Sequence, residues 1–308
     1  MTGRIVILGV FVADTAYRAD RPPRMGETIL GNSFALGPGG KGSNQAVAAA
    51  RLGADVSFLS RLGRDPFADM ALKTWEEAGV TPVVTQSEDS YTGAAYIFVE
   101  EATGDNAIII CPGAAATISS ADVEANAALI RSADIFVTQL EQPIEAAVRA
   151  LEIAREAGVR TILNPAPANS LPDGMLALCD FVTPNESETE GLTGMEVRSA
   201  DDAQRAADVV LSKGVGAAVI TLGEKGALFH SEGRSELVEA FDAGPVKETT
   251  GAGDAFNGGF AVALARGEDP VTAVRFGCAA AGISVTRPGT APSMPTLAEV
   301  EDLLRGSR

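Results

Sequence analysis

Short apolar segments alternate with longer amphipathic segments through most of this chain. The strand candidates are apolar on both faces: Ile5–Val10, Val56–Ser60, Ile135–Leu140, Thr161–Leu163, Phe181–Thr183 and Ala217–Leu222. A glycine, the residue that often ends a helix, follows each of the helix candidates within two residues: Asn44–Leu52, Phe67–Ala78, Ile144–Ala157 and Ala203–Ser212. Buried strands that alternate with helices predict an α/β fold, with a doubly wound, mostly parallel sheet flanked by helices.

Two segments break this alternation. Residues 15–36 contain several charges and a Pro-Pro pair, and residues 92–110 have the pattern of a hairpin with its turn at Thr103–Asn106. We expect these segments to form a small β-sheet that projects from an α/β body made of residues 1–14, 37–91 and 111–308. The alternative is two independent surface loops.

Charge and hydropathy exclude several classes of function. The 308 residues include 24 Lys and Arg against 41 Asp and Glu, a formal charge of −17, which argues against binding to nucleic acid or to anionic membranes. No apolar run reaches the ~18 residues that a membrane helix needs. The run from Ile5 to Ala13 leads into a charged loop without a convincing cleavage site, so we expect a buried strand and not a signal peptide. These patterns predict a soluble, cytoplasmic protein.

The cysteines and the single histidine exclude further kinds of site. Cys111, Cys179 and Cys278 are far apart in the sequence, which favours reduced thiols over a disulfide framework or a zinc site. His230 is the only histidine, so His-based metal sites and Ser-His-Asp triads lack their main residue. We expect His230 to be structural or exposed.

Polar residues follow five of the predicted strands. Ligands of open parallel sheets bind beyond the carboxyl ends of the strands, and such oxygens and amides suit sugar hydroxyls or a hydrated metal ion. Each residue alone could equally be an ordinary turn residue. The set is Asp14, Glu141, Asn164, Asn185 with Glu188, and Thr221 with Gly223.

Two glycine-rich turns each precede a helix. In Thr250–Asp254, small residues before the apolar helix Ala255–Ala265 would let backbone N–H groups approach an anion, with the Asp254 carboxylate beside it as a base. The alternative is an aspartate that merely caps the helix. In Gly37–Asn44, the glycines would let the backbone approach a ligand, or they form only a flexible turn. This second turn lacks the Walker A spacing, and no strand leads into the GxGxxG turn of nicotinamide-dependent enzymes.

The motifs of this chain, taken in order, resemble those of the ribokinase-like sugar kinases of the phosphofructokinase-B type, and within that family those of ribokinases. They cover nearly the whole chain: Gly39–Ala46, Leu140-Glu141, Asn164–Ala168, Thr183–Glu186, Thr221–Gly223, Gly251–Asp254 and Thr286–Gly289. The resemblance implies an enzyme that uses ATP and Mg²⁺ to phosphorylate the primary hydroxyl of a pentose such as ribose. A non-catalytic protein that senses sugar or nucleotide on the same fold is the alternative.

The resemblance also implies roles for particular residues. Asp254 would accept the hydroxyl proton, and Gly251, Ala252 and Gly253 would form the anion hole. The implied sugar ligands are Val12, Asp14, Gly40, Lys41, Gly42, Asn44, Glu141 and Asp254. The implied nucleotide site comprises Asn185, Thr221, Gly223, Gly226, Gly253 and Cys278. Asn185 and Glu188 would organise Mg²⁺ through water, and a monovalent cation such as K⁺ would lie among Glu248, Thr250, Ser284, Arg287, Gly289 and Ser293.

The resemblance further implies that residues 15–36 and 92–110 form a lid over the sugar and build a homodimer, with sugar and ATP as the other partners.

Two positions depart from the family pattern. Val12 replaces the usual Asn and cannot bond a sugar hydroxyl, which leaves 2-deoxyribose or another sugar or nucleoside as alternative substrates. Glu248 replaces the Asp that usually precedes Thr, and its longer side chain can displace the cation ligand, which argues against activation by K⁺.

Overall fold

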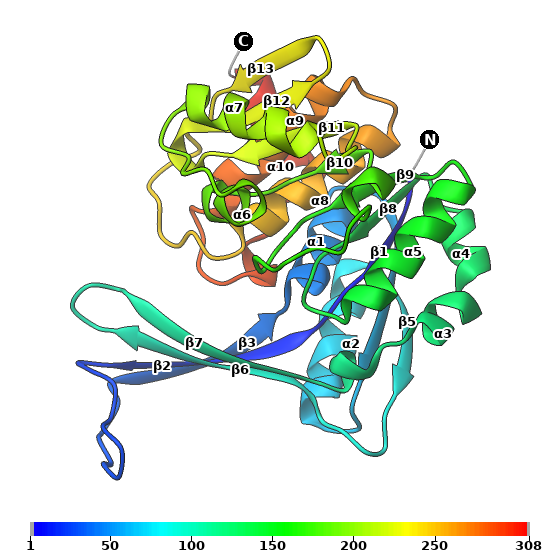
Figure 1. The fold of residues 1–308 in the computed structure, drawn as a ribbon. Coiled ribbons are helices and arrows are strands. Elements are labelled where there is room, and N and C mark those ends of the chain that lie inside the picture. Colours follow the sequence, from blue (N-terminus) through cyan, green and yellow to red (C-terminus); the bar gives the residue numbers. More distant parts are fainter. Residues whose placement is uncertain (1–2, 307–308) are drawn as a thin grey trace.

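The computed structural model describes residues 3–306, and a nine-stranded sheet forms its centre (Figure 1). The strand order is β13-β12-β11-β10-β9-β8-β1-β4-β5, in which only the pairs β11–β12 and β12–β13 are antiparallel. This sheet confirms the predicted fold class. Its strands are β1 (Arg4–Leu8), β4 (Asp55–Leu62), β5 (Thr81–Gln86), β8 (Ile135–Thr138), β9 (Arg160–Leu163), β10 (Phe181–Val182), β11 (Ala217–Thr221), β12 (Ala227–Ser231) and β13 (Arg234–Val238).

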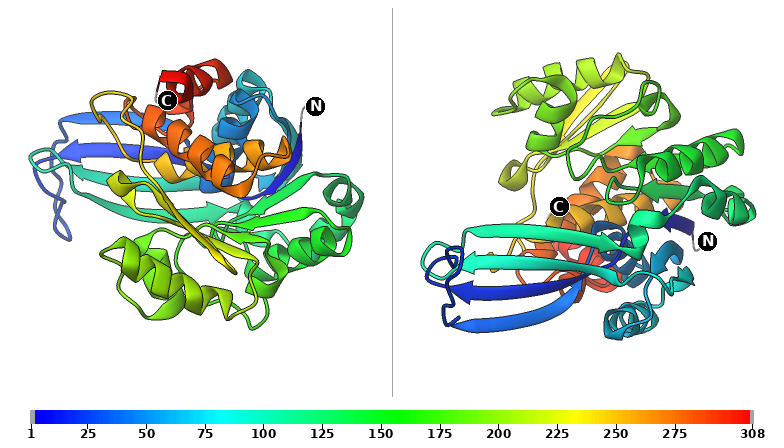
Figure 2. Two further views of the ribbon diagram at one scale, coloured as in Figure 1. Left: turned by 90° about the horizontal axis from the view of Figure 1, so that it is seen from above. Right: turned by 60° about the horizontal axis from the view of Figure 1, so that its bottom comes forward.

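Helices cover both faces of this sheet (Figure 2). Successive residues of β1 point to opposite faces, so Ile5 and Ile7 pack in one apolar cluster while Val6 and Leu8 pack in the other. One face carries α1 (Lys41–Arg51), α2 (Pro66–Ala78), α8 (Ala252–Ala265), α9 (Pro270–Ser284) and α10 (Leu297–Gly306). The other carries α3 (Ser120–Ala125), α4 (Ala127–Arg131), α5 (Ile144–Glu156) and α7 (Ala200–Leu211), and α6 (Glu186–Thr193) packs beside α7.

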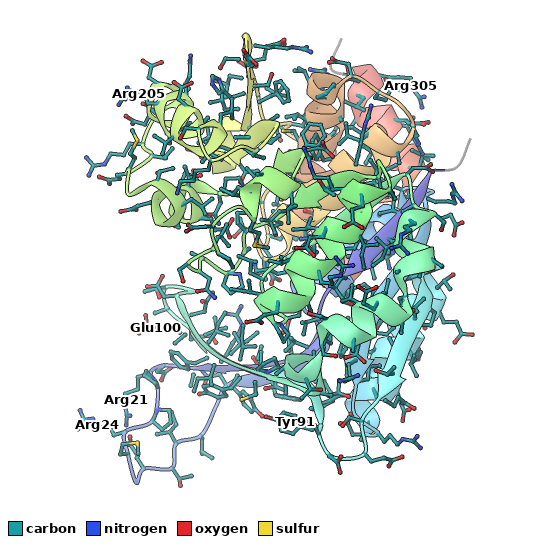
Figure 3. All side chains as sticks on the ribbon, turned by 45° about the vertical axis from the view of Figure 1, so that its right-hand side comes forward. Arg21, Arg24, Tyr91, Glu100, Arg205 and Arg305 are labelled. Atoms are coloured by element: carbon teal, nitrogen blue, oxygen red, sulfur yellow. The ribbon has the colours of Figure 1, made fainter. Side chains whose placement is uncertain are left out.

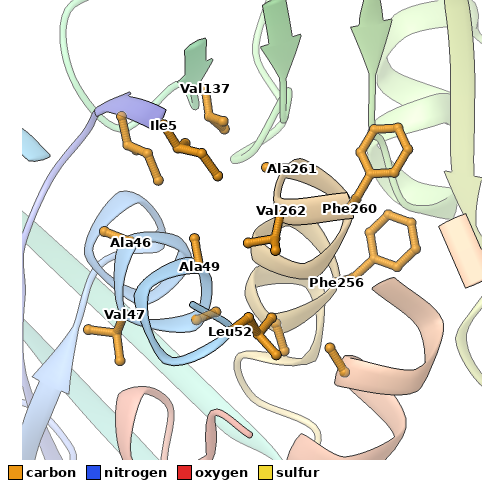
Figure 4. Close-up of a cluster of buried hydrophobic side chains, with 14 of the residues drawn as sticks. Ile5, Ala46, Val47, Ala49, Leu52, Val137, Phe256, Phe260, Ala261 and Val262 are labelled. Carbon is orange, nitrogen blue, oxygen red and sulfur yellow. The ribbon is translucent and has the colours of Figure 1, made fainter. Parts of the chain in front are cut away.

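The contact between α1 and α8 positions the site described below (Figure 4). Gly258 of α8 lies directly against α1, and a Cβ atom added to it would lie 2.5 Å from the Cβ of Ala48. Phe260 and Val262 of α8 are buried in the same cluster as Val47 of α1. This close approach brings the amino-terminal turns of the two helices together.

A second, four-stranded sheet projects from the body, as the sequence predicts (Figures 1 and 2). The predicted hairpin is present, and its first strand pairs in parallel with the strand that enters from β1. The alternative of two independent loops is therefore wrong. The strands, in the order β3-β2-β6-β7, are β2 (Val12–Ala19), β3 (Ser33–Gly39), β6 (Thr92–Glu100) and β7 (Asn106–Gly113).

The loop between β2 and β3 carries Arg21 and Arg24 at the far end of the second sheet (Figure 3). Arg21 closes this loop through two hydrogen bonds to the carboxylate of Glu27, at 2.5 and 2.7 Å. Because both side chains are exposed, this pair organises the loop more than it stabilises the fold.

The cysteines and the histidine match their expected roles within the described residues. All three cysteines are free: Cys111 is exposed, and Cys179 and Cys278 are buried. His230 is buried, and its Nε2 lies 2.9 Å from Oδ1 of Asp208 on α7, which is a structural contact. Across residues 3–306, none of the helices has the length and apolar character needed to cross a membrane.

Candidate active site

Asp254 lies at the meeting point of α1 and α8. It is the third residue of α8, and only 7% of its surface is exposed. Its Oδ2 accepts a hydrogen bond from Nδ2 of Asn44 (2.9 Å), and its Oδ1 accepts one from Nε2 of Gln45 (3.1 Å). The N-cap residue of α8 is Gly251, and no side chain caps this helix, so the alternative of a helix-capping aspartate is wrong. The carboxylate faces α1 instead, where these two amides hold it.

The backbone around Gly251–Gly253 has the room that an anion would need. Gly251 has φ 83°, a conformation that favours glycine, and a Cβ atom added to Gly253 would meet nothing within 4 Å. The N–H of Ala252 already donates to the carbonyl of Thr249 at 3.2 Å. Of the three expected anion-hole residues, Gly251 and Gly253 are therefore the better candidates.

The glycines at the start of α1 are required by contacts within the protein. Gly40 is the N-cap of α1 with φ 88°, and a Cβ atom there would lie 2.4 Å from the carbonyl oxygen of Val10. A Cβ atom on Gly42 would lie 2.7 Å from the Cα of Gly9. The alternative of a flexible turn is wrong, because these glycines let the start of α1 pack against the chain that follows β1.

Gly39 belongs to the glycine turn noted in the sequence, but its close approach to Asp14 was not predicted. A Cβ atom added to it would lie 2.1–2.6 Å from the carboxylate atoms of Asp14, which pairs across the sheet near it. Any side chain at position 39 would displace this carboxylate. The signal was present in the Gly39-Gly40 pair, but only the strand register shows which residue needs the space.

A group of carboxylates surrounds the Lys41 side chain. The backbone N–H of Lys41 donates to Oε2 of Glu141 at 2.8 Å. Burial lowers the pKa of Lys41, but the charges of Asp254, Glu141 and Glu188 outweigh burial and raise this pKa overall. Lys41 is therefore a firmly protonated cation within an acidic site, suited to an anionic substrate group.

Burial raises the pKa values of the carboxyl groups in this site. It raises the pKa of Asp14 to about 6, helped by the charges of Asp254 and Glu248. It raises the pKa of Glu141 to about 7, although Lys41 acts in the opposite direction. The pKa of Asp254 is also raised by burial, against the lowering effects of Lys41, Asn44 and Gln45. Carboxyl groups of this kind accept protons readily near neutral pH.

We predict that Glu141→Gln stabilises the protein at about pH 8 and not at about pH 4. From pH ~4.5 to ~7 the unfolded chain releases the Glu141 proton while the folded chain keeps it, so the stability of the wild type falls as pH rises. A neutral glutamine avoids this cost, which is about 3 kcal/mol above pH 7. Urea unfolding at both pH values measures the difference. If the variant and the wild type differ by the same free energy of unfolding at pH 8 and at pH 4, the raised pKa of Glu141 is wrong.

The expected magnesium residues form a helix cap. Oδ1 of Asn185 accepts from the N–H of Glu188 (2.8 Å), and Oε2 of Glu188 accepts from the N–H of Asn185 (2.9 Å), the reciprocal pair of a capping box. Burial raises the pKa of Glu188, with Lys41 and Asp254 near enough to influence it. Its other oxygen fits an outer-sphere contact with hydrated Mg²⁺, which keeps several of its waters in proteins. Within residues 3–306, no three His, Cys, Asp or Glu side chains are grouped to hold a metal directly.

The other expected nucleotide residues lie around β11 and α9. Thr221 ends β11, and Gly223 begins the short turn that follows. Gly226 has φ 98°, and a Cβ atom on it would lie 1.9 Å from the carbonyl oxygen of Val238, so its lack of a side chain has a packing reason. Cys278 is buried in the apolar cluster around α8 and α9, where burial raises the pKa of its thiol to about 12.

The residues expected around a monovalent cation lie on two segments that contact each other. Oε2 of Glu248 accepts from the N–H of Gly289 at 2.8 Å, and the N–H of Glu248 donates to the carbonyl of Val285 at 3.2 Å. Thr250 is exposed. The side chains of the remaining residues have partners: Ser284 with Ala281, Ser293 with Thr290, and Arg287 with Glu299. A cation here would therefore be held mainly by backbone oxygens.

Sequence reasoning also missed two buried glutamines. Gln45 lies on α1 beside Asp254, and Gln139 follows β8; both have no exposed surface. Asn164, which was among the polar strand-end residues, accepts a hydrogen bond from Gln45 at 3.1 Å. Glutamine carries no charge and has no strong positional pattern, so only the structure reveals these contacts.

Comparisons with known proteins identify the family of this chain. Residues 3–297 match the model of the pfkB family of carbohydrate kinases. The chain is 40% identical over 306 residues to a ribokinase of Haemophilus influenzae, covering 99% of both chains, and 37% identical over 302 residues to a deoxyribokinase of Salmonella typhi, covering 97% of this chain and 98% of that one. Among solved structures, it is similar to Arabidopsis thaliana ribokinase complexed with ribose and ATP (TM-score 0.92, 31% identity, 99% of both chains). It is also similar to ribokinase from Thermotoga maritima (TM-score 0.88, 35% identity, covering 98% of this chain and 99% of that one).

Proposed function

The chain belongs to the pfkB family of carbohydrate kinases, and on that premise we propose that it transfers the γ-phosphoryl group of ATP to the primary hydroxyl of a pentose, converting ribose to ribose 5-phosphate. The observation that carries this proposal is the buried Asp254 carboxylate, held by two amides beside the glycine turn that begins α8. Because the proposed co-substrate is ATP, we place the reaction in the cytoplasm.

The residues around Asp254 fit a sugar hydroxyl and a phosphoryl group. Oδ1 of Asn44 is buried and has no partner within the described residues, so it can accept a hydrogen bond from a sugar hydroxyl. Asp14 and Glu141 supply further acceptors, and Lys41 supplies positive charge. Lys41 and the first-turn amides of α8 would receive the phosphoryl group, and Asp254 would take the hydroxyl proton. This arrangement explains how a chain of charge −17 can bind a phosphate.

Mg²⁺ would enter with ATP and neutralise part of the phosphate charge. Glu188 and Asn185 are the residues that we propose for its hydrated shell. Asn185, Thr221, Gly223, Gly226, Gly253 and Cys278 remain our proposal for the nucleotide side, although the contacts of Gly226 and Cys278 within the protein make these two the weakest members.

A screen of ADP release tests the proposed function. Purified protein is given ATP, Mg²⁺ and one of a panel of pentoses, deoxypentoses, hexoses and nucleosides. We expect rapid sugar-dependent ADP release with ribose or 2-deoxyribose. Sugar binding in a calorimeter without ADP release from any sugar would favour the alternative of a non-catalytic sensor.

The main alternative substrate is 2-deoxyribose. The chain is 37% identical to a deoxyribokinase, and Val12 is a buried apolar residue two positions before Asp14 on β2. Those two residues share a face of the strand, because side chains alternate along it. A sugar hydroxyl placed next to Val12 would lack a partner.

We predict that Val12→Asn raises the preference for ribose over 2-deoxyribose. A hydroxyl buried without a partner costs about 1–3 kcal/mol, which corresponds to a change of about ten- to a hundred-fold in the ratio of the two kcat/KM values. Val12→Thr supplies a matched variant of nearly the same shape. If neither variant changes the ratio of the two kcat/KM values, Val12 does not determine the choice between ribose and 2-deoxyribose.

We propose a monovalent cation such as K⁺ between the segments of Glu248, Thr250, Ser284, Arg287, Gly289 and Ser293. The support is the backbone contact between these segments, together with the carboxylate of Glu248 between them. Reaction rates in potassium chloride and in choline chloride at equal ionic strength test this site. Equal rates would contradict it.

We propose that residues 15–36 and 92–110 act as a lid over the sugar and that their outer face joins two copies of the chain. Tyr17 contacts the rings of Phe34 and Tyr96, and strand alternation places Tyr17 on the face opposite Asp14. These three aromatic side chains are 38–56% exposed, and Leu36 is 45% exposed, which is unusual for large apolar residues on one sheet. Light scattering that gives the mass of a monomer at assay concentrations would contradict the dimer.

A further inference from the structure

The side chain of Gln45 is buried, and its amide is fully engaged in hydrogen bonds. Its Nε2 donates to Oδ1 of Asp254 and to Oδ1 of Asn164, both at 3.1 Å. Its Oε1 accepts from Nε2 of Gln139 at 2.7 Å. Gln45 therefore links the carboxylate on α8 to the residues that follow β8 and β9.

The orientation of this amide is set on one side by Asn164. Nδ2 of Asn164 donates to the backbone carbonyl of Thr183 at 3.0 Å. A carbonyl can only accept, so Nδ2 must face Thr183 and Oδ1 must face Gln45. Since Oδ1 of Asn164 can also only accept, it requires Nε2 of Gln45 on its side.

Gln139 is the partner of this amide on the other side, and its own Oε1 has no partner among the described residues. Its Nε2 faces Gln45, while its Oε1 lies against Gly9 and Gly42, where Cβ atoms would be only 2.5 and 2.7 Å away. If the amide of Gln45 were reversed, its Oε1 would face the acceptors of Asn164 and Asp254, and its Nε2 would face a donor. The reversed state loses the hydrogen bonds to Asn164 and Asp254.

We propose that Gln45 is a positioning residue, whose amide Asn164 locks so that an N–H group always faces Asp254, with Gln139 as the donor to its oxygen. This inference rests on the proposed function, in which Asp254 accepts the hydroxyl proton. The locked N–H fixes one carboxylate oxygen and favours the charged form of a buried group. Asn44 holds the other oxygen, and its own Oδ1 has no partner in the described chain, so Asn44 can turn toward the substrate while Gln45 cannot.

The charged groups around Asp254 come from several elements. Lys41 lies on α1, Asp14 on β2, Glu141 beyond β8 and Glu188 on α6. All of them contribute to the pH dependence of activity. Because Gln45 is uncharged, replacing it leaves these charges in place, and a change in the pH profile then reports the loss of its hydrogen bond to Asp254.

The test compares the pH profile of kcat/KM in the wild type and in Gln45→Met, using the sugar that the ADP-release screen identifies. Methionine has a similar length but donates no hydrogen bond. We expect the acid limb of the variant to move up by about one pH unit, because a hydrogen bond to a charged group is lost. At pH values below that limb, kcat/KM of the variant is about tenfold lower than that of the wild type. Well above the limb it lies within about threefold of the wild-type value, and KM is unchanged throughout.

Gln142→Met is the matched control. Gln142 is also buried beside β8, but its Nε2 donates to Oγ1 of Thr138 and to the backbone carbonyl of Gln139, away from Asp254. We expect its acid limb to match that of the wild type. Gln139 does not touch Asp254, so Gln139→Met should move the limb in the same direction as Gln45→Met but by less. It replaces Gln45→Met in this experiment if that variant does not fold.

An acid limb at the wild-type position in both Gln45→Met and Gln139→Met would overturn the inference. A loss of the same size at every pH would also overturn it, because that result indicates a merely structural role. Failure of the wild type to release ADP with any sugar contradicts the proposed function instead, so the two failures are distinguishable.

Discussion

Asp254→Asn is expected to lower kcat by at least ~10²-fold while the protein stays folded. Asparagine cannot accept the hydroxyl proton, and loss of a general base costs about this much. The fold should tolerate the change, because the amide of Asn44 can reverse to accept from the new NH₂ group, while Gln45 still donates to the remaining oxygen. Steady-state kinetics and thermal unfolding measure the two effects.

Asp202→Asn is the matched control for this variant. Asp202 is also the third residue of its helix, α7, where it accepts hydrogen bonds from the Ser199 side chain and the Arg205 guanidinium. We expect a small loss of stability and unchanged turnover, because this residue supports the N-cap Ser199 of a helix on the protein surface. A turnover of Asp254→Asn within a few-fold of the wild type would contradict the role of Asp254 as the base.

Lys41→Met is expected to lower kcat/KM by ~10²-fold or more. Lys41 is the cation among Asp254, Glu141 and Glu188, and it supplies the side-chain charge that we propose for the transferred phosphoryl group. Its loss also raises the pKa of each of those carboxyl groups, since their mutual repulsion is no longer balanced. Part of the activity should therefore return as pH rises, because Asp254 then regains its negative charge.

Lys73→Met controls for the loss of a positive charge. Lys73 is exposed on α2, where its ammonium group lies 3.8 Å from Oε1 of Glu77, a pair that contributes little to stability. We expect wild-type kinetics from this variant. A fall of less than about threefold in kcat/KM of Lys41→Met across the pH range would remove Lys41 from the proposed mechanism.

Much of the fold was predictable because it depends on local patterns. Burial on both faces of a strand and glycine at the end of a helix are visible in the sequence, and Gly79 adopts the left-handed conformation expected of it. The second sheet was predictable from its hairpin. The ends of the strands were harder to predict. β8 ends at Thr138 and not at Leu140, because the backbone N–H of Leu140 donates to the carbonyl of Ala166 and the side chain of Gln139 points into the core.

The contacts within the candidate site were only partly predictable. Asp254 was expected from the glycine turn before its helix, since the chemistry of an anion site is local. The need for Gly39 beside Asp14 depends on the register between β2 and β3, and the partners of Gln45 come from loops more than ninety residues away. Uncharged amides that pair across such distances leave no pattern in one sequence.

The most direct test of the central claim is the phosphorus NMR spectrum of the product formed from ATP and ribose, with 5-deoxyribose as the control. The proposed reaction predicts a new phosphomonoester signal coupled to the C5 protons of the sugar, formed together with ADP. It also predicts no phosphorylated product from 5-deoxyribose, which lacks the primary hydroxyl. A phosphate at another carbon, or equal turnover of the two sugars, would contradict the claim.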